Sequence, residues 1–183
     1  MKVVGFCGPS GVGKTTLVEQ LIPLLKAGGQ RVSVIKHAHK RFDIDQPGKD
    51  SWRHRQAGAF EVLVASGQRL ALLREYEAEG QPSVHQLIAE MVGCDWLLVE
   101  GFKHADILKI EVWRAALGAS AGQPGYPEDP FITAIATDTP AALPVPTGRP
   151  VFDLANPAAL ADYLVAHADR YTYRRPDGQP HHG

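Results

Sequence analysis

The stretch from Val3 to Thr16 constrains the fold of this chain more than any other part of its sequence. An apolar run leads into GPSGVGKT (residues 8–15), which has the form Gly-x4-Gly-Lys-Thr, and apolar residues at helical spacing follow it. A strand, a glycine-rich loop and a helix in this order form a phosphate-binding P-loop. Such a loop curls its backbone N–H groups toward phosphate oxygens, and the helix N-terminus adds partial positive charge.

The P-loop predicts both a fold and a set of phosphate ligands. We expect an α/β protein with a three-layer P-loop NTPase fold, in which helices flank a mostly parallel sheet. Within the loop, Lys14 should contact the β- and γ-phosphates of a nucleotide, and the Thr15 hydroxyl should bind Mg²⁺. The predicted phosphate-binding residues are Pro9, Ser10, Gly11, Val12, Gly13, Lys14, Thr15 and Thr16.

A second nucleotide-binding signal lies at the end of an apolar run, DWLLVEG (residues 95–101). In a strand beside the P-loop, Glu100 would orient a metal-bound water or polarise the attacking water. Lys14 and Glu100 are therefore the catalytic candidates, and Thr15 and Glu100 are candidate metal ligands. The alternative is that Glu100 merely ends a strand. Gly101 would let the backbone approach the γ-phosphate.

Further strands are predicted over residues 31–36, 61–66, 69–74, 108–113, 131–136 and 151–152, and helices over 51–59, 83–92 and 157–168. The runs 61–66 and 69–74 flank Gly67-Gln68, so we expect an antiparallel β-hairpin extension. The Gly-, Pro- and Ala-rich segment 115–129 is predicted to be a mobile loop. We expect one domain over residues 1–174 and a disordered tail over 175–183.

Ionisable side chains gather after the second predicted strand, at the sheet edge where α/β proteins bind ligands. One of the three aspartates there, Asp43, Asp45 or Asp50, could contact metal or phosphate, and Asp45 is the one taken as a metal ligand; a solvated loop is the alternative. A zinc site would lack further ligands, so an anion-binding surface is favoured, although an ordinary basic helix face fits as well. The residues concerned are Lys36, His37, His39, Lys49, Arg53 and Arg55.

Asp138 follows the predicted strand 131–136, where many GTPases read guanine with a carboxylate, although the usual Asn-Lys-x-Asp is absent. The net charge of −1 over 183 residues argues against wholesale binding to nucleic acid or an anionic membrane surface. No apolar run reaches the roughly 18 residues that a membrane span needs, so we expect a cytoplasmic protein. Cys7 and Cys94 are expected to be buried, reduced thiols without a chemical role.

Several segments together resemble the molybdopterin-guanine dinucleotide biosynthesis adapter (MobB) family over roughly residues 1–140. They are GPSGVGKTT (8–16), IKH (35–37), FDID (42–45), PGKDS (47–51), RQAGA (55–59) and VEGFK (99–103). The resemblance implies GTP binding with weak hydrolysis and a homodimer. It also implies a partnership with the guanylyltransferase that attaches GMP to molybdopterin, with molybdopterin itself as a further ligand.

Two classes of function compete at this point. The first is an adapter that binds GTP with Mg²⁺ and presents a nucleotide or pterin to a partner enzyme; the second is an autonomous kinase or NTPase with its own small substrate. A kinase lid should carry clustered arginines, and the candidate lid, 115–129, contains none. The hairpin runs are apolar on both faces, which favours self-association through them. Alternatively, the helix 83–92 covers the hairpin of a monomer.

Overall fold

The structure of the chain, a computed structural model, describes residues 1–38, 42–76, 80, 82–117 and 122–176. The contacts divide it into two compact units. One, the sheet unit, comprises Met1–His37 and Val84–Gly183; the other, the hairpin unit, comprises Ala38–Ser83. The single domain over 1–174 stays a prediction. The tail predicted over 175–183 lies outside the described residues from residue 177 onward.

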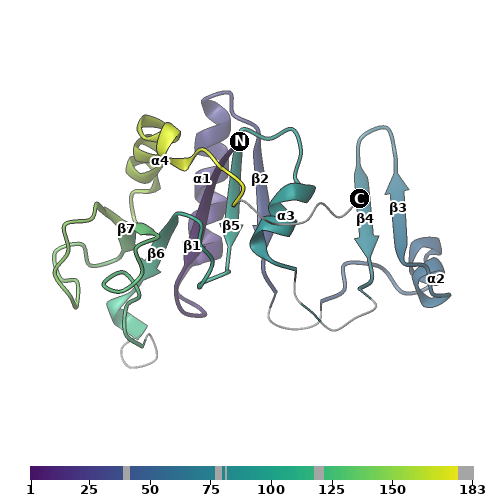
Figure 1. Cartoon of the computed structure of the whole chain (residues 1–183), viewed down its shortest axis with the longest axis horizontal. Helices are drawn as coiled ribbons and strands as arrows, with labels where there is room; N and C mark the ends of the chain where they lie inside the picture. Colours follow the sequence, from purple (N-terminus) through teal and green to yellow (C-terminus); the bar gives the residue numbers. More distant parts are fainter. Residues whose placement is uncertain (39–41, 77–79, 81, 118–121, 177–183) are drawn as a thin grey trace. The chain divides into compact units, whose positions relative to one another are not determined.

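The sheet unit is built on six parallel strands (Figure 1). In spatial order they are β2 (Val32–Lys36), β5 (Trp96–Glu100), β1 (Lys2–Cys7), β6 (Lys109–Trp113), β7 (Ile132–Thr137) and β8 (Val151–Asp153). Strands β5, β6 and β7 are buried along their whole length, as expected where both faces of a parallel sheet are covered. The P-loop strand β1 lies beside β5, which confirms the predicted neighbour.

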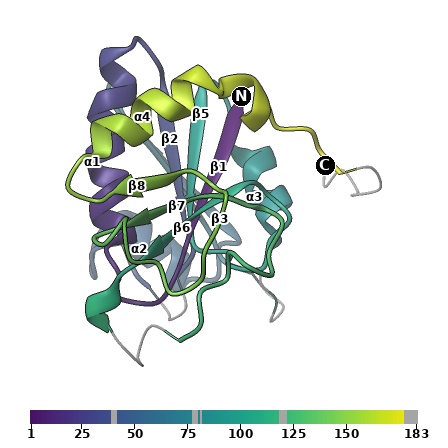
Figure 2. The ribbon, with the colours of Figure 1, turned by 90° about the vertical axis from the view of Figure 1, so that its left-hand side faces the viewer.

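Helices cover both faces of this sheet (Figure 2). On one face α1 (Lys14–Ala27) packs beside α4 (Pro157–Ala166), and their apolar side chains share a core with alternate residues of β1, β5, β6 and β7. On the other face α3 (Val84–Glu90) packs its Val84 and Ile88 on β1, β2 and β5. A short 3₁₀ helix, Ala168–Tyr171, follows α4. The three-layer arrangement confirms the predicted fold class.

Strand β6 lies within the predicted run 108–113, and its two charged residues, Lys109 and Glu111, are buried. Lys109 pairs with Asp129 at 2.8 Å, and the Glu111 carboxylate accepts hydrogen bonds from the N–H groups of Gly125 and Tyr126 at 2.8 and 2.7 Å. Burial raises the pKa of Glu111. Within the predicted loop 115–129, Gly125, Tyr126 and Asp129 are bonded to β6, and residues 118–121 lie outside the described part; the mobility of this loop stays a prediction.

The hairpin unit contains α2 (Asp50–Gln56) and the antiparallel pair β3 (Glu61–Ala65) and β4 (Leu70–Arg74). The predicted hairpin is confirmed, although four residues, 66–69, join the strands instead of two. Helix α2 begins at Asp50 with Lys49 as its N-cap and has no side-chain cap bond, so it starts one residue before the predicted 51–59. It ends at Gln56, and Gly58 then turns the chain with φ 97°.

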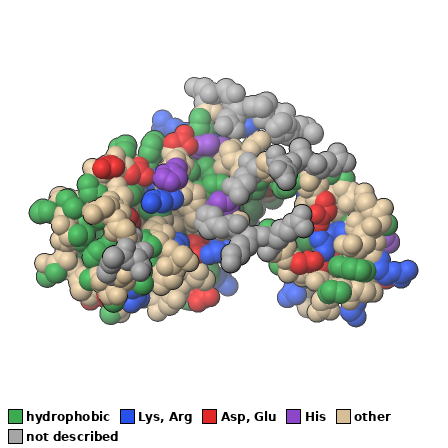
Figure 3. All heavy atoms as spheres, turned by 90° about the horizontal axis from the view of Figure 1, so that it is seen from below, with side chains coloured by type: hydrophobic (Ala, Val, Ile, Leu, Met, Phe, Trp, Pro, Cys, Tyr) green, Lys and Arg blue, Asp and Glu red, His purple; other side chains and the backbone are tan. Residues whose placement is uncertain are grey.

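Arg55 organises this unit from α2. Its guanidinium contacts Asp43 at 3.0 Å, Asp45 at 3.0 Å and Glu75 at 2.6 Å, and only 12% of the side chain is exposed. Arg55 is thus engaged by carboxylates of its own unit and does not extend a basic anion-binding surface. Figure 3 shows one face of the molecule, on which green hydrophobic side chains of this unit lie among charged ones.

Candidate nucleotide-binding site

The P-loop fits closely against the carboxyl end of β6. Gly8 has φ 132°, and a Cβ atom added there would lie 2.2 Å from the carbonyl oxygen of Val112. No side chain fits at this position without moving the loop or the strand. Gly13, the N-cap of α1, is left-handed with φ 99°. Glycine is needed at these positions because it has no Cβ to clash with β6 and because it adopts positive φ without strain.

Lys14 is folded back onto the loop that carries it. Its Nζ atom donates to the carbonyl oxygens of Gly8 at 2.8 Å and of Pro9 at 2.6 Å. Burial lowers the pKa of Lys14, and the nearby Glu100 carboxylate opposes that shift. The predicted phosphate-binding lysine therefore sits on the loop itself, with its ammonium bonded to carbonyl groups.

Thr15 and Glu100 meet as the sequence predicts. The Thr15 hydroxyl donates to Oε1 of the buried Glu100 carboxylate at 2.8 Å. A hydroxyl and a carboxylate are oxygen donors of the kind that Mg²⁺ prefers, so the pair fits this metal. Among the described residues no group of three or more His, Cys, Asp or Glu could hold a metal ion. A Mg²⁺ at this pair would take its remaining ligands from water and phosphate oxygens.

Lys36 is the third member of this cluster. The sequence had indicated Lys36 only as part of a general basic surface. Its Nζ atom donates to the same Glu100 Oε1, and it lies 3.4 Å from Thr15 Oγ1. The parallel register of β2 and β5 sets Lys36 directly opposite Glu100. A signal was present in the sequence, since both residues end apolar strands of a parallel sheet and such ends share one edge.

Gly101 follows Glu100 with φ 108°, and a Cβ there would lie 2.7 Å from His37 Cβ. The His37 backbone N–H donates to the Glu100 carbonyl oxygen at 2.9 Å, and the His37 ring stacks on Phe102 at 4.4 Å. Packing against His37 already requires glycine at this position. The approach of Gly101 to a γ-phosphate stays a prediction.

Arg114, which sequence reasoning missed, connects the P-loop to Asp138. Its Nε donates to the Val12 carbonyl oxygen at 2.8 Å, and Nη1 lies 3.7 Å from Asp138 Oδ2. The other oxygen, Asp138 Oδ1, is buried without a hydrogen-bond partner among the described atoms. Asp138 therefore lies at the same sheet edge as the P-loop, and one of its acceptor oxygens is enclosed by the protein. Arginine directly after a strand, beside the P-loop strand, is the signal that could have identified it.

The aspartates predicted near this site belong to the hairpin unit and have partners there. Asp45 accepts from Ser51 Oγ at 2.8 Å and from Arg55 Nε at 3.0 Å, whereas Asp50 lies 3.8 Å from Arg53. Hydrogen bonds from the Asp45 backbone N–H and from Arg55 lower the pKa of Asp43. These contacts give Asp45 a structural role, and its assignment as a metal ligand stays a prediction without support. His39 lies outside the described residues.

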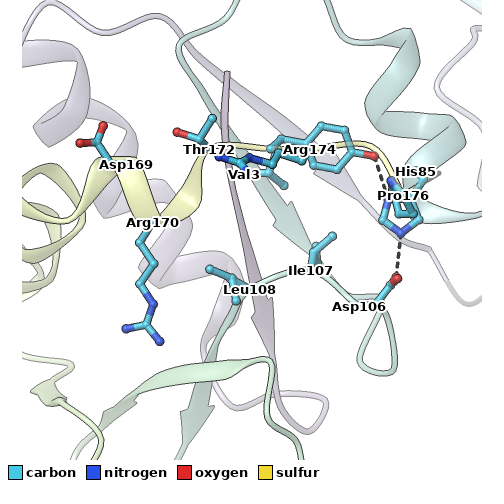
Figure 4. A pocket seen from close by; sticks show the side chains of 11 residues that line it. Val3, His85, Asp106, Ile107, Leu108, Asp169, Arg170, Thr172, Arg174 and Pro176 are labelled. Carbon is cyan, nitrogen blue, oxygen red and sulfur yellow. Dashed lines mark hydrogen bonds and ion pairs between the residues drawn. The ribbon is translucent and has the colours of Figure 1, made fainter.

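A separate cavity of about 350 Å³ lies near the amino end of β1, away from the P-loop (Figure 4). Three of its lining residues are bonded to one another: His85 Nδ1 bonds the Tyr173 hydroxyl at 2.8 Å, and His85 Nε2 bonds Asp106 at 2.7 Å. These bonds join the carboxyl-terminal segment to α3. Both cysteines are free thiols as expected; Cys7 is buried, which raises the pKa of its thiol to about 12, whereas Cys94 is half-buried and not buried as predicted.

Comparison with known proteins identifies the family. The family described as molybdopterin guanine dinucleotide synthesis protein B, MobB, matches residues 3–138, which include every P-loop residue, Glu100 and Asp138. The chain belongs to the MobB family. The resemblance seen in the sequence is thereby confirmed.

Within the part of the chain that the structure describes, no helix has the length and apolar character that a membrane span requires.

Relatives of known name support the assignment. The chain is 41% identical over 165 residues to the molybdopterin-guanine dinucleotide biosynthesis adapter protein of Escherichia coli, covering 89% of this chain and 91% of that protein. It is 37% identical over 166 residues to the protein of the same name from Haemophilus influenzae, covering 88% and 86%.

Solved MobB structures show the same fold. A MobB homolog from Bacillus stearothermophilus superposes with a TM-score of 0.69 at 22% identity, covering 93% of this chain and 99% of that one. Bacillus subtilis MobB gives a TM-score of 0.69 at 23% identity, covering 91% and 97%.

Proposed function

We propose that this protein is a GTP-binding adapter in the biosynthesis of molybdopterin guanine dinucleotide, with weak GTPase activity. The observation that carries the proposal is the meeting of Lys14, Thr15 and Glu100 at one sheet edge in a chain of the MobB family. The bacterial relatives named as adapters align over most of their length, which supports the same role here.

Each group at the edge has a distinct task in holding GTP. The backbone N–H groups of residues 9–16 and the Lys14 ammonium would bind the β- and γ-phosphates, for which Lys14 exchanges its two carbonyl partners for phosphate oxygens. Thr15 and Glu100 would hold Mg²⁺, which when bound neutralises phosphate charge. The Asp138 carboxylate, whose Oδ1 is buried without a partner among the described atoms, would have to turn toward the ligand to accept from a guanine N–H group, and this contact would favour GTP over ATP.

Slow hydrolysis fits the same geometry. Glu100 is the acidic group at the phosphate end of the site that could orient a water, but with Mg²⁺ bound it would be engaged as a ligand of the metal beside Thr15. A carboxylate engaged in this way is a weak base. An autonomous kinase remains the alternative, and a turnover assay with and without a phosphate acceptor distinguishes the two functions.

Calorimetric titration with GTP, ATP and molybdopterin tests the proposal. We expect GTP to bind more tightly than ATP. Lys14→Ala should weaken GTP binding about tenfold or more, because charge-assisted hydrogen bonds to phosphate are lost. Lys26→Ala is the matched control, since Lys26 is exposed at the far end of α1. Equal affinity of wild type and Lys14→Ala would refute the site.

The adapter role includes a partner and a second copy of the chain. We propose a homodimer formed through the hairpin unit and a complex with the guanylyltransferase that attaches GMP to molybdopterin. Leu63 and Leu72 face each other across β3 and β4 and are 58% and 43% exposed, and Leu70 beside them is also exposed. An exposed apolar face on a two-stranded sheet is usually covered by a partner.

Sedimentation equilibrium tests the dimer. We expect a species of twice the monomer mass of 19.8 kDa at micromolar concentration. Leu72→Lys should yield monomers that still bind GTP, because a buried unpaired charge opposes association. Gln68→Lys adds the same charge at the exposed turn and should leave the dimer intact. A wild-type monomer contradicts the dimer, and co-sedimentation with the guanylyltransferase tests the complex separately.

A further inference from the structure

Lys36 brings a positive charge to the two groups that would hold a metal. Its ammonium donates to Glu100 Oε1 and lies 3.4 Å from Thr15 Oγ1, so it occupies the space next to both oxygen donors. We propose that Lys36 is an internal counter-cation that competes with divalent metal for the Thr15–Glu100 pair. The proposal rests on the proposed nucleotide function and adds that the Lys36 ammonium and the metal compete for the Glu100 carboxylate.

The Glu100 carboxylate needs a cation because it is taken out of water. Only 5% of its side chain is exposed, and a buried carboxylate is costly unless it is paired. Lys14 does not serve as this partner, because its ammonium is bonded to the carbonyl oxygens of Gly8 and Pro9. Among the described residues, Lys36 is the cation with an ion pair to Glu100.

Lys36 is also able to leave. Its side chain is 54% exposed, and it extends from β2, the edge strand of the sheet. An exposed ammonium on a flexible stem can exchange its carboxylate for water at low cost. Glu100, by contrast, is fixed between β2 and β1 in the strand order, with Thr15 on its other side. The carboxylate is thus a stationary ligand, and the cation bound to it can be exchanged.

Removing Lys36 should therefore create a stronger metal site in the protein without nucleotide. We expect Lys36→Gln to bind Mn²⁺ about tenfold more tightly than wild type, because the metal no longer displaces an ammonium from a charge-assisted pair. Electron paramagnetic resonance of free Mn²⁺ measures this binding directly. Lys26→Gln also removes one positive charge, but at a position roughly 18 Å along α1 from Lys14 at the start of the helix. This variant should bind Mn²⁺ as wild type does.

Equal Mn²⁺ affinity of wild type and Lys36→Gln would overturn the proposal. Adding Glu100→Gln to Lys36→Gln should abolish the gain, and a gain that persists would place the metal elsewhere and also contradict it. Thermal unfolding establishes that each variant is folded. Lys36→Met, which keeps an apolar stem and cannot coordinate a hard cation, is the second variant and should show the same gain.

GTP titration in EDTA supplies a second readout. Without metal, Lys36 shields the phosphates from Glu100, so Lys36→Gln should bind GTP about tenfold more weakly than wild type, whereas with saturating Mg²⁺ the two should be equal. Equal affinities in EDTA contradict the role of Lys36. If wild type fails to bind GTP even with Mg²⁺, the proposed nucleotide function fails, and the Mn²⁺ titration still decides whether Lys36 competes with metal.

Discussion

Replacing Gly8 by alanine tests how the phosphate-binding loop is fixed to the sheet. A Cβ at Gly8 would lie 2.2 Å from the Val112 carbonyl oxygen, and φ there is 132°. Backbone strain of this kind costs about 1–3 kcal/mol, and forcing extra atoms into a packed region costs about 1–3 kcal/mol more. Alanine also lowers the conformational entropy of the unfolded chain, which offsets the destabilisation by about 0.4–1 kcal/mol. We expect Gly8→Ala to destabilise the protein by about 3 kcal/mol.

Gly11→Ala is the matched control, because Gly11 also has positive φ, 76°, but a Cβ there meets nothing within 4 Å. It should cost about 1 kcal/mol at most, since strain and the gain in the unfolded chain nearly cancel. For a chain of this size 1 kcal/mol shifts Tm by roughly 2–4 °C, so thermal unfolding separates the two variants by about 4 °C or more. Equal Tm values would refute the contact between the loop and β6.

Two other substitutions have defined outcomes. At saturating Mg²⁺, Glu100→Gln should bind GTP nearly as wild type does, because phosphate oxygens and Thr15 still hold the metal. It should release phosphate more slowly, because the amide lacks the charge that orients the attacking water; equal turnover at saturating GTP would leave Glu100 a structural role only. For Asp106, the hydrogen bond from His85 lowers the carboxyl pKa below its usual 3.8, so this pair adds stability above that pH and loses it on acidification. Asp106→Asn should show a smaller fall in Tm than wild type between about pH 5 and pH 2, and identical pH profiles would exclude this contribution.

Local sequence patterns sufficed for the parts of the fold that depend on neighbours in the chain. The P-loop and the hairpin each follow from a few adjacent residues. The family resemblance came from such short segments as well.

Contacts between distant segments were not predictable in the same way. Lys109 and Glu111 belong to an alternating run that predicts a strand but not its partners, which lie 14 to 20 residues later and satisfy both side chains inside the protein. The pairing of Lys36 with Glu100 depends on the order in which parallel strands are placed, and the bond from Arg114 to Val12 depends on the turn of the P-loop. One sequence contains no signal for such geometry beyond the edge at which strands end.

The carboxylates around Arg55 also bear on how the hairpin unit responds to its surroundings. Two strands and a seven-residue helix form a marginal structure on their own, so the Arg55 contacts carry much of its order. Amide protons of β3 and β4 should therefore exchange with solvent faster than those of β1 and β5, which belong to the buried core. Added salt should accelerate exchange in the hairpin further by screening those ion pairs. Binding of a second copy would slow it selectively, which makes hydrogen exchange a residue-level measure of assembly.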